Sequence, residues 1–235
     1  MIIKQTYVRI FCENMETINK REEELDVLSS TQKLYIALKR VVDFFVSLFM
    51  FIPFLVLFLI VKLAYLFKND NDRILYKQNR IGKDGKEFLI YKFRTMSPDA
   101  EKQLNELLKN SDNKEEWRQF HKLKNDPRIT EFGLFLRKSS IDEFPQFINV
   151  LKGDMSIIGP RPLVPGELEM HGGKKFYNII KPGITGWWAC NGRSDISYDE
   201  RLENEYFYIR NVSLVLDIKI IFMTISCVLK KAGAR

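Results

Sequence analysis

Two adjacent carboxylates, Asp142 and Glu143, lie in the stretch of the sequence whose residue types are most informative about chemistry. They belong to the stretch RKSSIDEFPQFINVLKGDMSIIGPRP, residues 137–162, and precede the apolar spacing of a helix. Pro145 has no backbone donor, and a helix capped by Asp142 puts this proline at the third helical position, where no donor is needed. The sequence therefore predicts that Asp142 is a helix cap and that both carboxylates lie near the positive end of the helix dipole.

Cations flank this carboxylate pair and suit a phosphate-bearing substrate. Arg137 precedes it, and Arg161 follows between Pro160 and Pro162, which stiffen the backbone around the guanidinium. We expect a carboxylate among cations to keep a low pKa, and an ionised Asp142 could attack phosphorus to form a reactive acyl phosphate. Magnesium would offset the repulsion between carboxylate and phosphates. The alternative is that Asp142 only caps a helix and the arginines are surface charges.

An uncharged apolar run at residues 44–61, FFVSLFMFIPFLVLFLIV, points to membrane contact. A helix of about 18–21 residues is roughly 27–31 Å long, enough to cross a bilayer. Pro53 removes a helical hydrogen bond in mid-run. Basic residues flank both ends: Lys33, Lys39, Arg40, Lys62, Lys68 and Arg73. Because Lys and Arg collect on the cytoplasmic side, this pattern favours a re-entrant helix that bends at Pro53 over a simple span or a buried core helix.

Two charged residues, Arg40 and Asp43, lie just before the apolar run in the sequence. They are three positions apart, on one face of a helix, so they could pair and lower the cost of burying either charge. The alternative is that both lie among lipid headgroups.

The overall composition bounds the class of protein. The chain has 235 residues, a net charge of +7 and 46% hydrophobic residues, which suits one domain with an accessory segment. Its 18 Phe argue against intrinsic disorder. Cys12, Cys190 and Cys227 are odd in number and far apart, which excludes a disulfide framework and indicates reduced thiols.

Local patterns predict the elements that must position these residues. Residues 73–80 and 86–93 read as two strands joined at Asp84-Gly85, a hairpin turn signal. Residues 98–124 read as helical with a break at 110–113. The apolar stretch 213–229 is either a core helix or a helix lying in the membrane interface.

Other candidate sites are weaker. His121 and His171 are isolated, so neither a zinc site nor a Ser-His-Asp triad has support. Asp70-Asn71-Asp72 has the DxD form that many nucleotide-sugar glycosyltransferases use to hold a metal, but it follows no βαβ unit and is interpreted as a turn at the membrane exit.

With these residues in view, residues 39–233 resemble the bacterial sugar transferase family, the monotopic phosphoglycosyl transferases. Many motifs in the same order carry the resemblance: KRxxD at Lys39, Arg40 and Asp43, KQNRIG at 77–82, YKFRTM at 91–96, NDPRIT at 125–130, LRKSSIDEFPQ at 136–146, NVLKGDMSIIGPRP at 149–162, KPGITGW at 181–187, NGR at 191–193 and SLVLDIKI at 213–220. The chain departs from the family in having Ile52-Pro53 about one turn early and Glu205 where Asp is usual.

The resemblance implies a mostly helical α+β fold in three parts. Residues 1–38 would be a polar N-terminal extension, residues 39–68 a re-entrant membrane helix broken at Pro53, and residues 69–235 a small catalytic domain with a β-hairpin and interfacial amphipathic helices. The catalytic domain would lie on the cytoplasmic face of the bacterial inner membrane.

The resemblance also implies a reaction. Asp142 would attack the β-phosphate of a UDP-sugar, release UMP and pass the phosphosugar to undecaprenyl phosphate, the first membrane step of exopolysaccharide, capsule or glycoconjugate synthesis. Glu143 would help to position Mg²⁺ or the acceptor, with Asp142 and Glu143 as the metal ligands. Arg137, Arg161 and Lys92 would hold substrate phosphates.

Two other functions compete with this one. A metal-dependent glycosyltransferase would use Asp70 and Asp72 and release UDP. A basic membrane-anchored scaffold would bind an anionic partner without turnover. No nucleic-acid motif is present, so we expect the basic residues to contact membrane lipid. The sequence leaves open the transferred sugar and the oligomeric state, with which a homodimer is compatible.

Overall fold

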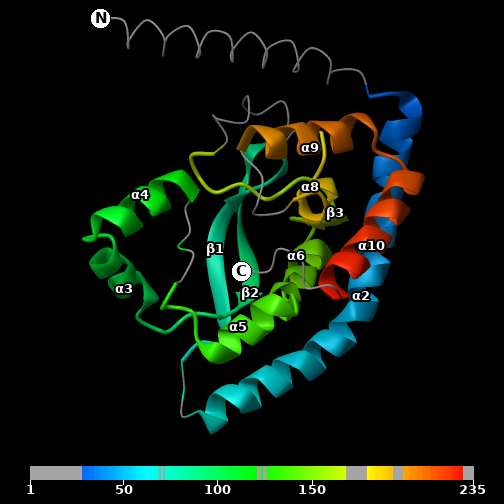
Figure 1. Cartoon of the computed structure of the whole chain (residues 1–235). Coiled ribbons are helices and arrows are strands. Elements are labelled where there is room, and N and C mark those ends of the chain that lie inside the picture. The colour runs from blue at the N-terminus through cyan, green and yellow to red at the C-terminus, as the bar shows by residue number, and fades with distance from the viewer. Residues whose placement is uncertain are drawn as a thin grey trace, which may run out of the picture.

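The computed structural model describes residues 28–68, 70, 72–120, 123, 126–167, 179–192 and 198–229, without the side chains of 118–120 and 198–199. Residues 1–27 of the predicted extension, His121, His171 and Arg193 of the NGR motif lie outside the described residues. The predicted mostly helical α+β fold with one antiparallel hairpin is confirmed (Figure 1). Its elements are α2 (Ser30–Phe67), β1 (Leu75–Ile81), β2 (Glu87–Phe93), α3 (Ala100–Leu107), α4 (Ser111–Phe120), α5 (Glu131–Lys138), α6 (Gln146–Lys152), β3 (Ser156–Ile158), β4 (Gly183–Thr185), α8 (Trp187–Cys190), α9 (Tyr198–Arg210) and α10 (Leu214–Leu229).

Helix α2 contains the whole apolar run. Ser29 begins it with a capping box, in which its hydroxyl accepts the backbone N–H of Gln32 and its own N–H bonds the Gln32 side chain. The helix continues through Pro53, and in Figure 1 it changes direction part-way along. In the described part of the chain it is the one helix long and apolar enough to cross a membrane.

Both halves of α2 pack against the rest of the protein. Near its start, Lys39 and Asp43 are buried against α10 and β3. Towards its end, Phe54 and Val61 are buried in a cluster with Phe93 of β2. Between these contacts many large apolar side chains remain exposed: Phe45, Leu48, Phe49, Ile52, Leu55, Val56, Leu59, Ile60 and Leu63. The helix therefore has one face against protein and one that needs an apolar surrounding.

The predicted hairpin is confirmed with small shifts of its ends. β1 and β2 pair antiparallel from Leu75 opposite Phe93 to Ile81 opposite Glu87. The turn holds Asp84 at φ 62° and Gly85 at φ 67°, left-handed conformations that Asp and Gly adopt more easily than most residues. A second small sheet pairs β3 and β4 in parallel.

The helical stretch after the hairpin divides into two helices as predicted, but the break is earlier than expected. α3 and α4 are separated at residues 108–110, and residues 111–113 of the predicted break form the first turn of α4. Thr130 then caps α5 by accepting the backbone N–H of Gly133 at 2.9 Å. Figure 1 shows α5 beside the later part of α2, and Leu136 of α5 lies in the cluster formed there with Phe54 and Phe93.

Helix α10 has one face in the core and one apolar face that is exposed, so it fits the core-helix prediction on one side and leaves the membrane-interface prediction untested. It buries Asp217 and Ile220 against the protein. Its other face exposes Leu214, Val215, Ile218, Ile221, Phe222, Ile225 and Leu229. It runs beside the earlier part of α2 (Figure 1), and Asp217 of α10 bonds Tyr35 and Lys39 of that part.

The contact of α5 with the strand segment after β2 predicts a stability effect. A Cβ atom on Gly133 would lie 1.9 Å from the carbonyl oxygen of Thr95, a backbone atom that cannot move alone. We expect Gly133→Ala to lower the free energy of unfolding by about 1–3 kcal/mol, measured by thermal unfolding in detergent. Gly82→Ala is the control, because its Cβ would meet the movable Phe88 ring at 3.1 Å and would come no closer than 3.6 Å to the Lys86 carbonyl oxygen. Equal stability of the two variants would contradict this packing.

Candidate active site

The adjacent carboxylates lie in a tight turn between α5 and α6. Ile141–Glu143 form a single 3-10 turn, and α6 begins only at Gln146, with Pro145 as its cap. The prediction that Asp142 caps this helix is therefore wrong. Ser140 adopts φ 56° before the turn, so the chain folds back at that point and the turn, not the helix, carries both carboxylates.

Cations from two other elements approach this turn. Lys92 of β2 donates to Glu143 Oε1 at 2.9 Å. Arg137 at the end of α5 is anchored by its Nε, which donates to the Thr95 hydroxyl at 2.9 Å. The charges of Lys92 and Arg137 both act on Asp142, so the structure brings together four of the five predicted site residues.

The expected low pKa of Asp142 is not found. Asp142 is only 9% exposed, and burial raises its pKa to about 6. The charge of Glu143 raises the pKa as well, and Lys92 and Arg137 only partly offset these two effects. Asp142 is thus mostly ionised at neutral pH but poorly solvated, and perturbed carboxylates of this kind are common at functional sites.

The fifth predicted residue, Arg161, lies on a separate loop after β3. Its guanidinium donates to Glu167 at 3.2 Å, and its backbone N–H points to Glu205 Oε1 at 3.4 Å. Glu205, the position that departs from the family pattern, is fully buried beneath this loop. The contacts of Arg161 therefore fix the loop to neighbouring carboxylates.

Arg80 is the site residue that the sequence reasoning passed over. It follows Gln78 on the same face of β1, donates to the Pro162 carbonyl at 3.1 Å and to Gln78 at 2.7 Å. Burial and, to a smaller extent, the charge of Arg161 lower the pKa of Arg80 to about 10, and the charges of Glu167 and Glu143 oppose this shift. Arg80 therefore lies between the carboxylate turn and the Arg161 loop. Side chains alternate between the two faces of a strand, and β1 ends inside the KQNRIG motif. This alternation puts Arg80 on the same face as Gln78, and it was the signal in the sequence that could have identified Arg80.

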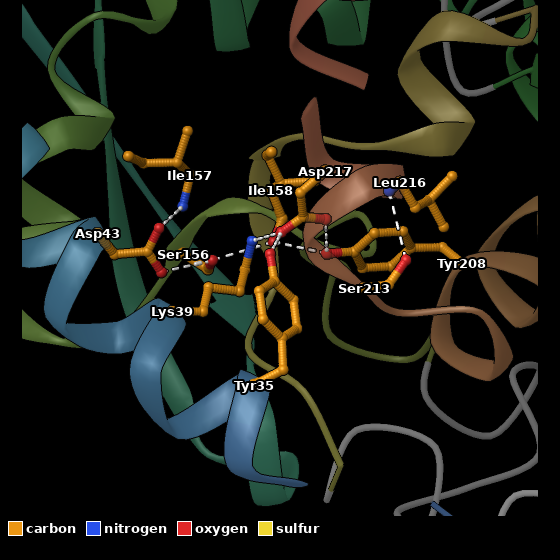
Figure 2. Close-up of polar contacts among 10 residues, drawn as sticks. All are labelled: Tyr35, Lys39, Asp43, Ser156, Ile157, Ile158, Tyr208, Ser213, Leu216 and Asp217. Atoms are coloured by element: carbon orange, nitrogen blue, oxygen red, sulfur yellow. Dashed lines mark hydrogen bonds and ion pairs between the residues drawn. The ribbon is translucent and has the colours of Figure 1, made fainter. Parts of the chain in front are cut away.

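Arg40 and Asp43 do not pair with each other, contrary to one of the two sequence interpretations. Arg40 donates to the carbonyls of Val150 at 2.6 Å and Leu151 at 3.2 Å, at the end of α6. Figure 2 shows Asp43 facing β3, where it accepts the Ser156 hydroxyl and the backbone N–H of Ile157. The headgroup interpretation also fails for Asp43, which is 4% exposed.

The DxD carboxylates have partners within the chain. Asp70 forms an ion pair with Arg94 at 2.8 Å, and it accepts the backbone N–H of Asp72 at 3.1 Å. Asp72 in turn accepts the backbone N–H of Arg73 at 2.7 Å. These bonds describe a turn, which agrees with the interpretation preferred from the sequence.

The donor set at the turn suits a shared magnesium ion better than a closed metal site. Within the described residues no three His, Cys, Asp or Glu side chains gather where they could hold a metal. Asp142 and Glu143 are two neighbouring oxygen donors whose repulsion a divalent cation would relieve. Mg²⁺ is commonly held by one or two carboxylates together with substrate phosphates, so these residues fit it.

Comparisons with known proteins agree on one family. The family model described as bacterial sugar transferase matches residues 34–231. An undecaprenyl-phosphate galactose phosphotransferase of Salmonella typhimurium is 46% identical over 178 residues, which are 75% of this chain and 37% of that protein. A UDP-galactose-lipid carrier transferase of Erwinia amylovora is 44% identical over 74% of this chain and 37% of its own length. The exopolysaccharide production protein ExoY of Rhizobium meliloti is 42% identical over 80% of this chain and 83% of its own length. The chain thus spans well under half of the first two relatives.

The raised pKa predicts that Asp142 costs stability. Its folded-state pKa of about 6 exceeds the ordinary 3.8, so the ionised form destabilises the fold above pH 6 by on the order of 2–3 kcal/mol, and the cost vanishes below about pH 4. Asp142→Asn should therefore raise the thermal midpoint in detergent at pH 8, without divalent cations, and the gain should fade as the pH is lowered.

Asp126 provides the matched control for that prediction. It is buried, but two bonds to Arg128, at 2.8 and 2.6 Å, outweigh burial and lower its pKa. Its charge contributes stability above the ordinary pKa, and this contribution is lost as the pH falls. Asp126→Asn should lower the midpoint at pH 8. A destabilised Asp142→Asn would show that the charge at residue 142 is well compensated.

Proposed function

The chain belongs to the bacterial sugar transferase family, and on that basis we propose that it transfers a sugar-1-phosphate from a UDP-sugar to undecaprenyl phosphate. The observation that carries the proposal is the buried, cation-flanked Asp142, with its pKa raised by burial and by Glu143. The names of the relatives support a role in exopolysaccharide or capsule synthesis, and donors are named as UDP-galactose or UDP-N-acetylgalactosamine for individual relatives.

In the first proposed step, an ionised carboxylate oxygen of Asp142 attacks the β-phosphorus of the UDP-sugar. A bond forms between this oxygen and phosphorus, and the bond from phosphorus to the bridging oxygen of the diphosphate breaks. That oxygen leaves with UMP, and the sugar phosphate stays on Asp142 as an acyl phosphate. A carboxylate with a pKa of about 6 is mostly ionised at neutral pH, and its burial leaves little hydration to remove before attack.

In the second proposed step, a phosphate oxygen of undecaprenyl phosphate attacks the same phosphorus. The bond between phosphorus and the Asp142 oxygen breaks, which restores the carboxylate and yields undecaprenyl-diphosphate-sugar. Carboxylate is a good leaving group from an acyl phosphate, so the intermediate passes its phosphosugar on rather than trapping it.

Cations would stabilise the charge that both steps place on phosphate oxygens. Arg137 is held towards the turn by Thr95, and Lys92 reaches it from β2. Arg161 would hold the nucleotide phosphates from the loop after β3. Mg²⁺, held by Asp142 and Glu143, would supply further positive charge next to the diphosphate.

We propose that α2 is a re-entrant membrane helix and that residues 69–235 form a catalytic domain on the cytoplasmic face of the bacterial inner membrane. Lys39 near its start bonds Asp217, and Tyr65 near its end donates to the Arg94 carbonyl. A straight helix would separate these residues by about 39 Å, more than the bilayer core. Contacts at both ends with one small domain therefore support a helix that enters and leaves on the same side, with Pro53 allowing the bend.

The competing glycosyltransferase proposal has less support. It needs Asp70 for a metal ion, but Asp70 is already engaged by Arg94. A scaffold without catalytic activity would have no use for Asp142, whose burial lowers the stability of the fold.

The nucleotide product tests the proposed reaction. Membranes containing the protein, given a set of UDP-sugars with Mg²⁺ and undecaprenyl phosphate, should release UMP, because attack falls on the β-phosphorus. Asp142→Ala should reduce turnover by at least about 10³-fold, and mass spectrometry of wild-type enzyme with donor alone should find a sugar-phosphate adduct on residue 142. Asp70→Ala is the control and should remain active. UDP as product, with activity lost in Asp70→Ala, would favour the competing glycosyltransferase.

Cysteine labelling tests the topology. In a variant without the native cysteines, Lys33→Cys and Lys68→Cys place a thiol at exposed positions on either side of the apolar run. A membrane-impermeant maleimide should label both in inside-out vesicles and neither in intact spheroplasts. Labelling of the two positions from opposite sides would establish a simple span.

A further inference from the structure

A buried polar cluster joins α2 to three later elements, and the proposed chemistry makes no use of it (Figure 2). We call it the polar junction; its members are Tyr35, Lys39, Asp43, Ser156, Tyr208 and Asp217. The three charged members are each less than 10% exposed. Burying charges is costly unless each has partners, and here Lys39, Asp43 and Asp217 are all hydrogen-bonded.

One half of the polar junction consists of hydrogen bonds between side chains of helices only. Asp217 of α10 accepts the Tyr35 hydroxyl at 2.6 Å and the Lys39 ammonium on one oxygen, and the Tyr208 hydroxyl at 2.7 Å on the other. All of these partners are side chains of helices. This half therefore stabilises the packing of α2 against α9 and α10.

The other half acts on a strand. Asp43 Oδ2 accepts the Ser156 hydroxyl at 2.7 Å, and Oδ1 accepts the backbone N–H of Ile157 at 3.2 Å. The Ser156 hydroxyl is also 3.0 Å from the Ile158 carbonyl oxygen. Asp43 thus fixes β3 from the side opposite its pairing with β4.

The constraint on β3 continues directly into the Arg161 loop. The next residue, Gly159, donates its N–H to Thr185 at 2.9 Å, and a Cβ atom there would lie 2.4 Å from the Lys181 carbonyl oxygen. The Pro160 carbonyl then accepts the Gly183 N–H at 2.8 Å. Because these bonds and the close backbone packing leave residues 159–160 little freedom, the placement of β3 decides where Arg161 begins.

From this continuous path we propose that Asp43, inside the membrane helix, is a positioning residue for Arg161. The Asp43 carboxylate fixes β3, β3 fixes the Gly159-Pro160 backbone, and that backbone places Arg161. The Arg161 guanidinium donates to Glu167 at 3.2 Å in this structure and would exchange this partner for the diphosphate of the nucleotide donor. The proposal rests on the proposed function for the identity of the donor. In this proposal, α2 helps to bind the soluble nucleotide donor through Asp43, in addition to its contact with lipid.

Steady-state kinetics on membrane preparations test the proposal with three variants. Asp43→Ala leaves the Ile157 N–H without its acceptor, and should raise KM for the UDP-sugar about tenfold with KM for undecaprenyl phosphate unchanged. Asp43→Asn should stay within about threefold of wild type, because an amide offers an oxygen to Ile157 and an N–H to Ser156. Ser47→Ala is the control; Ser47 lies one turn along α2, is buried, and has no hydrogen-bond partner among the described residues.

A double-mutant cycle separates positioning from general destabilisation. If Asp43 acts through Arg161, then Asp43→Ala should add no further rise in donor KM to Arg161→Lys. Should Asp43→Ala fail to fold, Ser156→Ala replaces it, because it removes the same side-chain bond and leaves Ile157 bonded. A fall in kcat with donor KM unchanged, or multiplicative effects in the cycle, would overturn the proposal. A wild-type protein that releases no UMP from any UDP-sugar would instead refute the proposed function.

Discussion

The structure depends on how a charged helix face is buried where an apolar helix meets a polar domain. Lys39 and Asp43 precede the apolar run by a few residues, yet both are buried against residues more than 100 positions later in the chain. Such charges are tolerated only with nearly complete hydrogen bonding, so the angle and register of α2 on the domain are strongly specified. Apolar contacts alone, as on the exposed face of α2, would allow the helix to slide or rotate.

The later part of α2 supports the turn that carries Asp142, where this carboxylate is poorly solvated. Phe54 and Val61 of α2 pack with Phe93 and Leu136, which lie next to Lys92 and Arg137 in the sequence. An apolar layer therefore supports the cations, and Asp142 is the buried residue of the turn that they approach. In this position desolvation outweighs the attraction of the cations, and the pKa of Asp142 rises rather than falls.

Local sequence signals predicted the elements well and the contacts poorly. The Asp84-Gly85 turn, the break between α3 and α4 and the apolar run of α2 each follow from neighbouring residues, and all three were predicted. The cap at Asp142 was wrong because Ser140 adopts a left-handed conformation and diverts the chain into a 3-10 turn. The pairing of Arg40 with Asp43 was wrong because each finds backbone partners on α6 or β3 that helix periodicity cannot reveal.

The sequence by itself determined the family, the long apolar segment and the carboxylate pair, because motif order, apolar runs and neighbouring residue types can all be read along the chain. Only the tertiary structure decided that Asp142 is poorly solvated, that Arg80 joins the site and that Asp43 fixes β3. Each of these depends on burial or on an approach between distant segments. Such effects arise from the exclusion of water by packed elements, and no local spacing of residues encodes how much water a given carboxylate will lose.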